Sequence, residues 1–98
     1  MSSYAKGRRL EYLVRDLFHE KGYVVIRAAR SKPIDLVCMR NGKTLLVECK
    51  TNRSNLTKDR KKELLRLAEA SGASLILAFK NKRNIEFIDL KNDSPWVL

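Results

Sequence analysis

Cysteine is scarce in this chain of 98 residues, which contains only Cys38 and Cys49. Two cysteines alone do not make a zinc site, which needs four ligands. In the hairpin register derived below, the two side chains point to the same face but do not lie opposite each other, so we expect no disulfide between them. The cysteines therefore indicate buried, free thiols in a reducing compartment.

Long apolar runs are also lacking. No segment approaches the length of a membrane span, and no signal-peptide pattern opens the chain, so we expect a cytoplasmic protein that has no membrane partner. Internal repeats and low-complexity segments are absent as well. Apolar residues make up 44% of the sequence, which argues against a disordered chain and suits one domain over residues 1–98 with a modest core.

Acidic residues are few compared with basic ones. Lys and Arg number 21 and Asp and Glu number 11, which gives a net charge of +10. Such a charge on a small domain favours a polyanionic partner, although a basic surface can also serve only to keep a protein soluble. Nucleic acid is favoured over a membrane because no basic amphipathic helix with exposed aromatic residues stands out. RNA binding has no support from an aromatic-rich stacking motif.

Apolar periodicity predicts two helices. The first covers Ser3–Lys21 and ends at Gly22, because apolar side chains recur at the spacing of one helical face. The second covers Lys58–Ser71 and ends at Gly72. Its charged start, Lys58–Lys62, is predicted to face solvent unless it contacts phosphates. The apolar stripe of the first helix consists of Leu10, Leu13, Val14, Leu17 and Phe18.

Five strands are predicted from short β-rich segments bounded by polar turns. Together with the helices they give the order αβββαββ, an α+β or mixed α/β sandwich around one sheet. The strands are Tyr23–Ala28, the two arms of a hairpin centred on Asn41-Gly42, Ser74–Phe79 and Asn84–Leu90, with a basic turn over Lys80–Asn84 and a tail over Asn92–Leu98.

The dipeptide Asn41-Gly42 sets the register of the hairpin. A type I′ turn needs positive φ at both central positions, which Asn and Gly tolerate best. With these residues as the loop, counting outward places Asp35 opposite Glu48. One face of the hairpin carries this acidic pair and the other is wholly apolar, so both strands are predicted to be covered on both sides. The apolar face is predicted to consist of Ile34, Leu36, Cys38, Leu45, Val47 and Cys49.

Asp35 and Glu48 are the most informative pair in the sequence. Directly opposite residues have Cβ atoms about 4.5–5.5 Å apart, and like charges so placed destabilise a sheet unless a cation, a proton or a basic side chain compensates. Lys50 lies two residues beyond Glu48 and projects from the same face. A divalent metal held by the two carboxylates, with an ammonium group beside it, suits the hydrolysis of a phosphodiester.

Mg²⁺ is the expected metal, because it prefers oxygen ligands and leaves positions open for water and phosphate oxygens. The Cys49 carbonyl could be a further ligand, and Glu11, at the edge of the apolar stripe, could reach the metal from above the sheet. The alternative is that Glu48 and Lys50 are an ordinary exposed pair and that Glu11 is a solvated helix residue. The register, the net charge and the apolar surroundings favour a site.

Asp35 is followed by twelve residues and then by Glu48-Cys49-Lys50. This pattern resembles the motif of the PD-(D/E)xK nuclease superfamily. Three other segments resemble the archaeal Holliday-junction resolvases in particular. In chain order, they match a Lys-Gly-x-x-x-Glu motif near the start of the chain, a strand that contains an arginine and is followed by a loop with a serine, and a late strand that ends in lysine. Those segments are Lys6–Glu11, Val25–Asp35 and Leu77–Lys80, and the similarity spans about residues 4–90.

The resemblance implies a restriction-endonuclease-like fold, with a central mixed sheet flanked by helices, and a two-fold homodimer. It also implies Mg²⁺ as the cofactor, which Mn²⁺ is expected to replace. The catalytic residues that it implies are Glu11, Asp35, Glu48 and Lys50, with Ser31 in a supporting role.

Two positions depart from the family's pattern. Tyr12 stands where a basic residue often follows the glutamate of the first helix, and Arg30 stands where a glycine usually precedes the serine. The resemblance implies DNA contacts by Arg27 and Lys80. The other basic residues expected at the DNA are Lys6, Arg8, Arg9, Arg30 and Lys32.

The sequence therefore predicts a metal-dependent, structure-selective DNA endonuclease that resolves four-way (Holliday) junctions by paired symmetric nicks in recombination and repair. Two alternatives remain. One is a related nuclease that acts on other branched or foreign DNA, and the other is a DNA-binding module of the same fold without catalytic activity. The shape of the DNA is expected to determine selectivity, and affinity is expected to fall steeply with salt.

Overall fold

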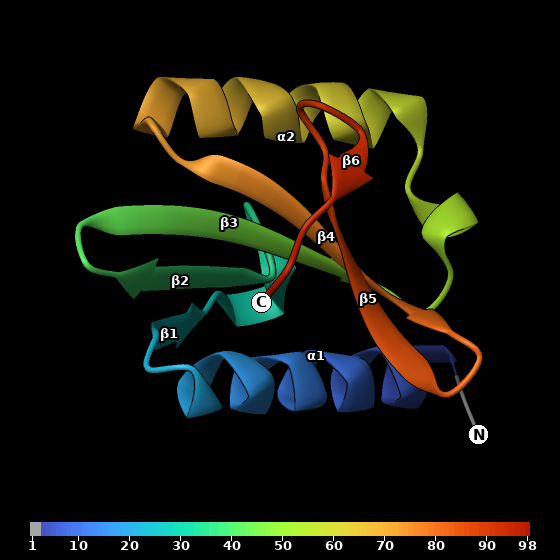
Figure 1. The fold of residues 1–98 in the computed structure, drawn as a ribbon. Coiled ribbons are helices and arrows are strands. Elements are labelled where there is room, and N and C mark those ends of the chain that lie inside the picture. Colours follow the sequence, from blue (N-terminus) through green and yellow to red (C-terminus); the bar gives the residue numbers. More distant parts are fainter. Residues whose placement is uncertain (1–2) are drawn as a thin grey trace.

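The computed structural model describes residues 3–98, apart from the side chains of Ser3, Tyr4 and Ser31. A twisted mixed sheet lies between two helices, one on each face (Figure 1), which confirms the predicted fold class. The strand order is β1-β2-β3-β4-β5-β6, and β3 and β4 are parallel whereas the other neighbours are antiparallel. The elements are α1 (Ser3–Glu20), β1 (Val24–Arg27), β2 (Leu36–Arg40), β3 (Lys43–Lys50), α2 (Lys58–Ser71), β4 (Ser74–Asn81), β5 (Asn84–Asp89) and β6 (Ser94–Pro95), with 3-10 turns at Ala29–Ser31 and Arg53–Asn55.

The β2–β3 hairpin has the predicted turn and register. Asn41 and Gly42 have φ values of 51° and 78°, so both have the positive φ that a type I′ turn requires. Arg40 pairs with Lys43, and the last pair of the ladder is Leu36 with Val47. Asp35 lies directly before this ladder and Glu48 directly after Val47, so the predicted opposition of the two would continue the register by one step beyond the last observed pair.

Helix α1 packs on one face of the sheet through Leu10, Val14 and Phe18, which are buried. Leu13, predicted to lie in the same apolar stripe, is 43% exposed, and that prediction was wrong. Successive residues are about 100° apart around a helix, so Leu13 is turned well away from Val14 at the centre of the buried face. Glu11, on the other side of this face, is buried instead.

Helix α2 covers the opposite face through Leu64 and Ala68, which pack with Leu46 and Leu77. Ile34 joins this second cluster, although the hairpin pattern predicted it on the same face as Leu36, which packs in the cluster beneath α1. The alternation of side chains holds only within a strand, and Ile34 precedes the start of β2. Both faces of β3 are therefore covered, as predicted.

The limits of α2 agree with the prediction, because Thr57 caps its start and Gly72 ends it with a φ of 69°. The predicted basic turn over Lys80–Asn84 is shorter than expected, since β4 continues to Asn81 and β5 begins at Asn84. The predicted tail contains the short strand β6, which the sequence did not suggest. Trp96, next to this strand, stacks on Phe18 with ring centroids 5.9 Å apart.

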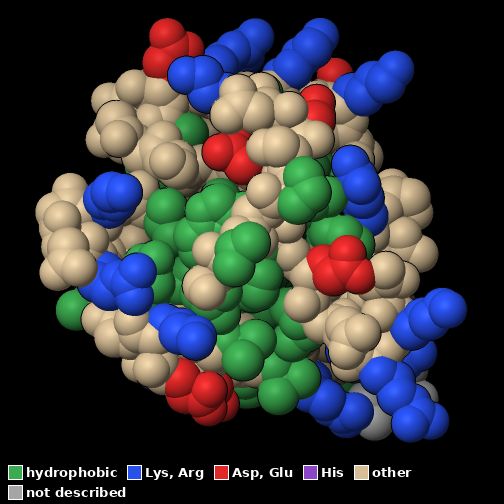
Figure 2. Space-filling view, viewed as in Figure 1, with side chains coloured by type: hydrophobic (Ala, Val, Ile, Leu, Met, Phe, Trp, Pro, Cys, Tyr) green, Lys and Arg blue, Asp and Glu red, His purple; other side chains and the backbone are tan. Residues whose placement is uncertain are grey.

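Hydrophobic side chains gather at the centre of one face of the molecule, around the C-terminal segment, and Lys and Arg side chains surround them (Figure 2). Basic side chains also project from the edges of this face. Among the described residues, no helix is long and apolar enough to cross a membrane.

Candidate active site

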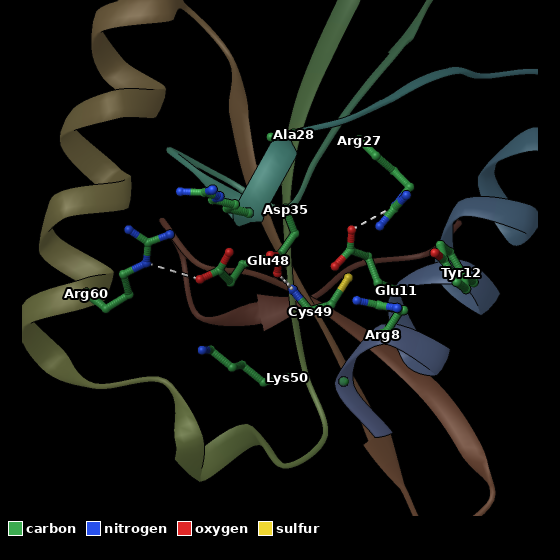
Figure 3. Close-up of a pocket in the computed structure, with 12 residues that line it drawn as sticks. Arg8, Glu11, Tyr12, Arg27, Ala28, Asp35, Glu48, Cys49, Lys50 and Arg60 are labelled. Carbon is green, nitrogen blue, oxygen red and sulfur yellow. Dashed lines mark hydrogen bonds and ion pairs between the residues drawn. The ribbon is translucent and has the colours of Figure 1, made fainter. Parts of the chain in front are cut away.

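A cavity of about 790 Å³ opens where α1, β1, β3 and the start of α2 meet (Figure 3). It brings together Glu11, Asp35, Glu48 and Lys50, the four residues to which the sequence assigns catalytic roles. The carbonyl group of Cys49 belongs to the same stretch of β3. The remaining residues that line the cavity are Gly7, Arg8, Tyr12, Arg27, Ala28, Arg30 and Arg60.

Asp35 is held at the entry to β2. The side chain is only 7% exposed, and its Oδ2 accepts a 2.8 Å hydrogen bond from the backbone amide of Cys49. This bond ties Asp35 to β3 beside Glu48, because Cys49 follows Glu48 directly. The two carboxylates are thus brought together by main-chain geometry as well as by strand register.

Glu48 is the most buried acidic residue among those described, with 3% exposure. Its Oε2 accepts a 3.1 Å hydrogen bond from Arg60 Nε, whereas its Oε1 is buried with no hydrogen-bond partner among the described residues. Burial raises the pKa of the Glu48 carboxyl to about 7, with a further contribution from the negative charge of Asp35, although the bond from Arg60 lowers it. The hydrogen bond from Arg60 therefore offsets only part of the cost of burying the negative charge of Glu48.

A divalent cation fits this arrangement. The Oε1 atom of Glu48 is a buried acceptor with no donor, and a cation beside it would offset both the desolvation and the repulsion from Asp35. Within the part of the chain that the structure describes, no three carboxylate, histidine or cysteine side chains form a complete metal cluster. Two carboxylates with open positions for water and substrate suit Mg²⁺, which keeps several water ligands.

Glu11 lies in the same cavity but is bonded to a basic residue. Arg27 Nε donates a 3.0 Å hydrogen bond to Glu11 Oε1, and the Arg27 guanidinium lies over the ring of Tyr12, 4.5 Å from its centroid. Arg15 lies over the same ring at 4.8 Å. Tyr12 therefore holds two arginine side chains at this wall of the cavity through cation–π contacts.

Lys50 is half-buried and lines the cavity on the side of Glu48 (Figure 3). Its position two residues beyond Glu48 on β3 gives both side chains the same face of the sheet, as the sequence predicts. An ammonium group placed beside two carboxylates can donate hydrogen bonds to a phosphate oxygen that enters the cavity.

Three of the residues expected to contact DNA line the cavity, namely Arg8, Arg27 and Arg30. The other four, Lys6, Arg9, Lys32 and Lys80, are exposed outside it. Arg30 has a φ of 58°, in the left-handed region that glycine adopts most easily. Glycine would adopt this conformation with less strain than Arg30. Ser31, predicted to support catalysis, has a side chain outside the described residues.

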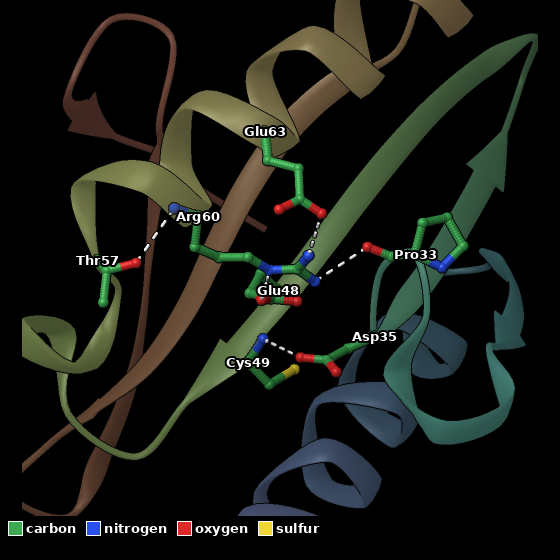
Figure 4. A network of polar contacts seen from close by, with 7 residues as sticks. All are labelled: Pro33, Asp35, Glu48, Cys49, Thr57, Arg60 and Glu63. Atoms are coloured by element: carbon green, nitrogen blue, oxygen red, sulfur yellow. Dashed lines mark hydrogen bonds and ion pairs between the residues drawn. The ribbon is translucent and has the colours of Figure 1, made fainter.

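Arg60 is the residue of the site that the sequence did not identify. The charged segment Lys58–Lys62 was predicted to face solvent, but Arg60 points into the cavity and is 26% exposed. It donates to Glu48, to Glu63 and to the carbonyl of Pro33 (Figure 4). The only indication in the sequence was the position of Arg60 in the first turn after Thr57, which does not reveal a contact with another element.

Comparisons with known proteins match one family of junction nucleases. The family model described as archaeal Holliday junction resolvase (Hjc) matches residues 2–94. The crossover junction endodeoxyribonuclease Hjc of Methanocaldococcus jannaschii is 34% identical over 89 aligned positions, and the match covers 88% of this chain and 67% of that protein. The protein of the same name from Sulfolobus acidocaldarius is 29% identical over 98 aligned positions, and the match covers 90% of this chain and 68% of that protein.

A solved structure agrees as well. Archaeoglobus fulgidus Hjc, described as a Holliday junction resolvase from an archaeal hyperthermophile, superposes with a TM-score of 0.77 and 26% sequence identity. The match covers 88% of this chain and 74% of that chain. Because the family model spans nearly the whole sequence, the chain belongs to the archaeal Holliday junction resolvase family.

Proposed function

We propose that this protein is a metal-dependent, structure-selective DNA endonuclease that resolves four-way junctions by paired symmetric nicks during homologous recombination and repair. Residues 1–98 would act as one nuclease domain, on DNA inside the cell. The single observation that carries the proposal is the buried acidic pair of Asp35 and Glu48, with an unpartnered carboxylate oxygen, beside Lys50 in an arginine-lined cavity. Three relatives that are named as junction nucleases support it.

Asp35 and Glu48 would hold Mg²⁺, with the Cys49 carbonyl as a further ligand and Mn²⁺ as a substitute. When bound, the metal would supply a nucleophilic water and would offset negative charge on the reacting phosphate. Glu11, which is paired with Arg27 at the opposite wall, would reach this centre from α1. Lys50 would donate hydrogen bonds to a phosphate oxygen and so stabilise the charge that develops there. Ser31 would support these residues.

The basic residues would position the DNA. Arg8, Arg27 and Arg30 line the cavity and would contact the phosphates nearest the reaction. The remaining exposed basic residues would follow the backbone farther away, so that affinity falls steeply with salt and does not depend on base sequence. These outer residues are Lys6, Arg9, Lys32 and Lys80.

A two-fold homodimer would present two such sites to one junction. Resolution needs two nicks related by symmetry, and a closed two-fold dimer supplies that relationship. The apolar side chains gathered on one face (Figure 2) are a feature of surfaces that associate. Sedimentation equilibrium at micromolar concentration tests this part of the proposal, and a mass of one chain at all concentrations would contradict it.

Two other functions give different results in simple assays. A nuclease for other branched or foreign DNA would cut flaps, forks or linear duplex as well as it cuts a junction. A DNA-binding module would bind without cutting in either Mg²⁺ or Mn²⁺. The acidic pair disfavours the module, because a buried carboxylate with a raised pKa destabilises the fold and gives no benefit to binding a polyanion.

The experiment that tests the proposal is cleavage of a labelled, immobile four-way junction in Mg²⁺ and in EDTA. Wild type is compared with Glu48→Gln and with the matched control Glu69→Gln, which removes an exposed carboxylate from α2. We expect paired symmetric nicks from wild type and Glu69→Gln in Mg²⁺ only, and none from Glu48→Gln. Equal cutting of junction and linear duplex would exclude a resolvase, and tight binding without cutting would favour the module.

A further inference from the structure

Arg60 connects three segments around the acidic pair (Figure 4). Its Nε donates a 3.1 Å hydrogen bond to Glu48 Oε2 on β3. Its other two nitrogens donate to Glu63 Oε1 on α2 at 2.9 Å and to the Pro33 carbonyl at 3.0 Å. Pro33 lies two residues before Asp35, so the guanidinium contacts both the strand that carries Glu48 and the loop that leads to Asp35.

The backbone of Arg60 is fixed as well. Thr57 caps α2, and its hydroxyl accepts a 3.1 Å hydrogen bond from the Arg60 amide. A guanidinium is a planar group whose nitrogens have fixed relative directions. With the main chain anchored at the cap and three nitrogens bonded, the side chain of Arg60 has little freedom to rotate.

The contact with Arg60 makes the two oxygens of Glu48 different. Oε2 is the acceptor for Arg60, whereas Oε1 is buried and has no partner among the described residues. Because a carboxylate is planar, fixing the direction of Oε2 also fixes the direction of Oε1. Arg60 thus leaves one oxygen of Glu48 available for a ligand in a defined orientation.

We propose that Arg60 is a positioning residue, which orients Glu48 so that Oε1 is presented to the divalent cation that Glu48 and Asp35 would share. This inference rests on the proposed nuclease function and adds a residue to it. Side chains that hydrogen-bond to metal ligands typically change metal affinity or activity by about 10–100-fold when they are replaced. Arg60 occupies such a place, because it contacts a ligand residue and not the reacting phosphate.

Two simpler roles predict different behaviour. If Arg60 only supplied positive charge to the acidic pair, lysine would replace it without loss, although lysine lacks the planar fork. If Arg60 were mainly a contact for DNA phosphate, its replacement would weaken junction binding. Its three hydrogen bonds to protein acceptors and its 26% exposure favour positioning over a contact with DNA.

The test compares Arg60→Lys with the matched control Arg66→Lys, which makes the same change at an exposed position of α2 outside the cavity. Apparent Mg²⁺ affinity is obtained from the rise in melting temperature of the DNA-free protein as Mg²⁺ is added. Junction affinity is measured in EDTA, and cleavage is measured under single-turnover conditions. For Arg60→Lys we expect Mg²⁺ affinity to fall about 10–100-fold and cleavage at low Mg²⁺ to fall with it, while junction affinity changes less than about threefold.

Wild-type Mg²⁺ affinity in Arg60→Lys would overturn the positioning role, and so would a parallel loss of junction affinity. If Arg60→Lys does not fold, Glu63→Ala replaces it as the test, because it removes a 66% exposed partner of Arg60 without touching Glu48. We then expect Mg²⁺ affinity to weaken by about threefold to tenfold, and an unchanged Mg²⁺ titration would overturn the inference. If the wild-type protein cuts no junction, the proposed function is refuted. The comparison of Mg²⁺ titrations between wild type and Arg60→Lys still tests the role of Arg60 in that case.

Discussion

The carboxylate of Asp35 accepts a 2.8 Å hydrogen bond from the backbone amide of Cys49. The bond lies beyond the last pair of the β2–β3 ladder, Leu36 with Val47, and holds Asp35 next to the strand that carries Glu48. The fold therefore keeps two acidic groups together in a place where burial makes their charges costly. A local conflict of this kind, in an otherwise consistent fold, is expected where a sequence is selected for function.

Replacing Asp35 with asparagine should raise the stability of the metal-free protein and abolish cleavage. The change removes the negative charge that helps to raise the pKa of Glu48, while the amide oxygen of asparagine can still accept from Cys49. Relief of a like-charge contact is worth up to about 1 kcal/mol, which raises the melting temperature of a domain of this size by about 4–8 °C. We expect Asp35→Asn to melt higher than wild type in EDTA at pH 8, to bind the junction and not to cut it.

Differential scanning fluorimetry measures this effect, and Asp16→Asn is the matched control, because Asp16 is an exposed acid on α1. A lower melting temperature for Asp35→Asn than for wild type would contradict a net repulsion between Asp35 and Glu48. Loss of junction binding together with cleavage would contradict the assignment of Asp35 to the chemical step.

Stability without metal should depend on pH through Glu48. Its pKa is raised from 4.5 to about 7, first by burial and then by Asp35. A carboxyl whose pKa is higher in the folded state stabilises the fold while it is protonated, so this contribution is full below about pH 4.5 and is lost as pH rises through about 7. A difference of this size corresponds to about 3 kcal/mol.

Urea unfolding in EDTA at pH 5 and at pH 8 measures this contribution, with Glu48→Gln as the reference that lacks the titration. We expect the free energy of unfolding of wild type to fall by about 2–3 kcal/mol relative to Glu48→Gln between these two pH values. Comparison with the variant cancels the titration of other groups. If the difference between the two proteins stays constant with pH, the pKa of Glu48 is not raised.

The hairpin and the acidic pair could be predicted because they depend on local rules. Asn41-Gly42 determines the turn, and the alternation of side chains then carries the register outward to Asp35 and Glu48. The limits of α2 followed from Gly72 and from the start of the charged segment in the same way. Each of these features is decided by residues that are neighbours in sequence or in one hairpin.

The features that sequence reasoning missed depend on contacts between elements. Arg60 belongs to a segment whose composition suggests a solvated surface, and only the packing of α2 against β3 brings it to Glu48. Ile34 lies outside the regular strand, so alternation does not determine its face. Leu13 has the spacing of a buried residue, but the direction from which the sheet approaches α1 leaves it exposed.

Lys50 should be required for cleavage and not for binding. Its side chain lines the same cavity as the acidic pair, where the ammonium group can stabilise charge on the reacting phosphate. We expect Lys50→Ala to lower the single-turnover rate on a four-way junction by about 10²–10³-fold and to leave the junction dissociation constant within about threefold of wild type. Lys43→Ala, an exposed lysine at the other end of β3, serves as the control and should cut normally. A rate for Lys50→Ala within about threefold of wild type would exclude this role.

The two cysteines should be unreactive in the folded protein. Burial raises the pKa of the Cys38 thiol to about 12, and burial followed by the charge of Asp35 raises the pKa of Cys49 well above its ordinary value. Only the thiolate is a good nucleophile. We expect alkylation by iodoacetamide at pH 8 to be at least about 100-fold slower than in urea, as followed by mass spectrometry. Fast labelling of Cys49 in the folded protein would show that its surroundings are more open than the structure indicates.

Arg27 should contribute to DNA binding through charge. It is bonded to Glu11 and stacked on Tyr12 at the wall of the cavity, yet it keeps 37% of its side chain exposed to an approaching phosphate. Each phosphate contact adds about 0.9 to the slope of log affinity against log salt. In anisotropy measurements with a labelled junction in EDTA, we expect Arg27→Met to reduce that slope by about one and to weaken binding most at low salt. Arg66→Met, which removes an exposed charge from α2 outside the cavity, should leave the slope nearly unchanged. Equal slopes for Arg27→Met and wild type would mean that Arg27 serves only to hold Glu11.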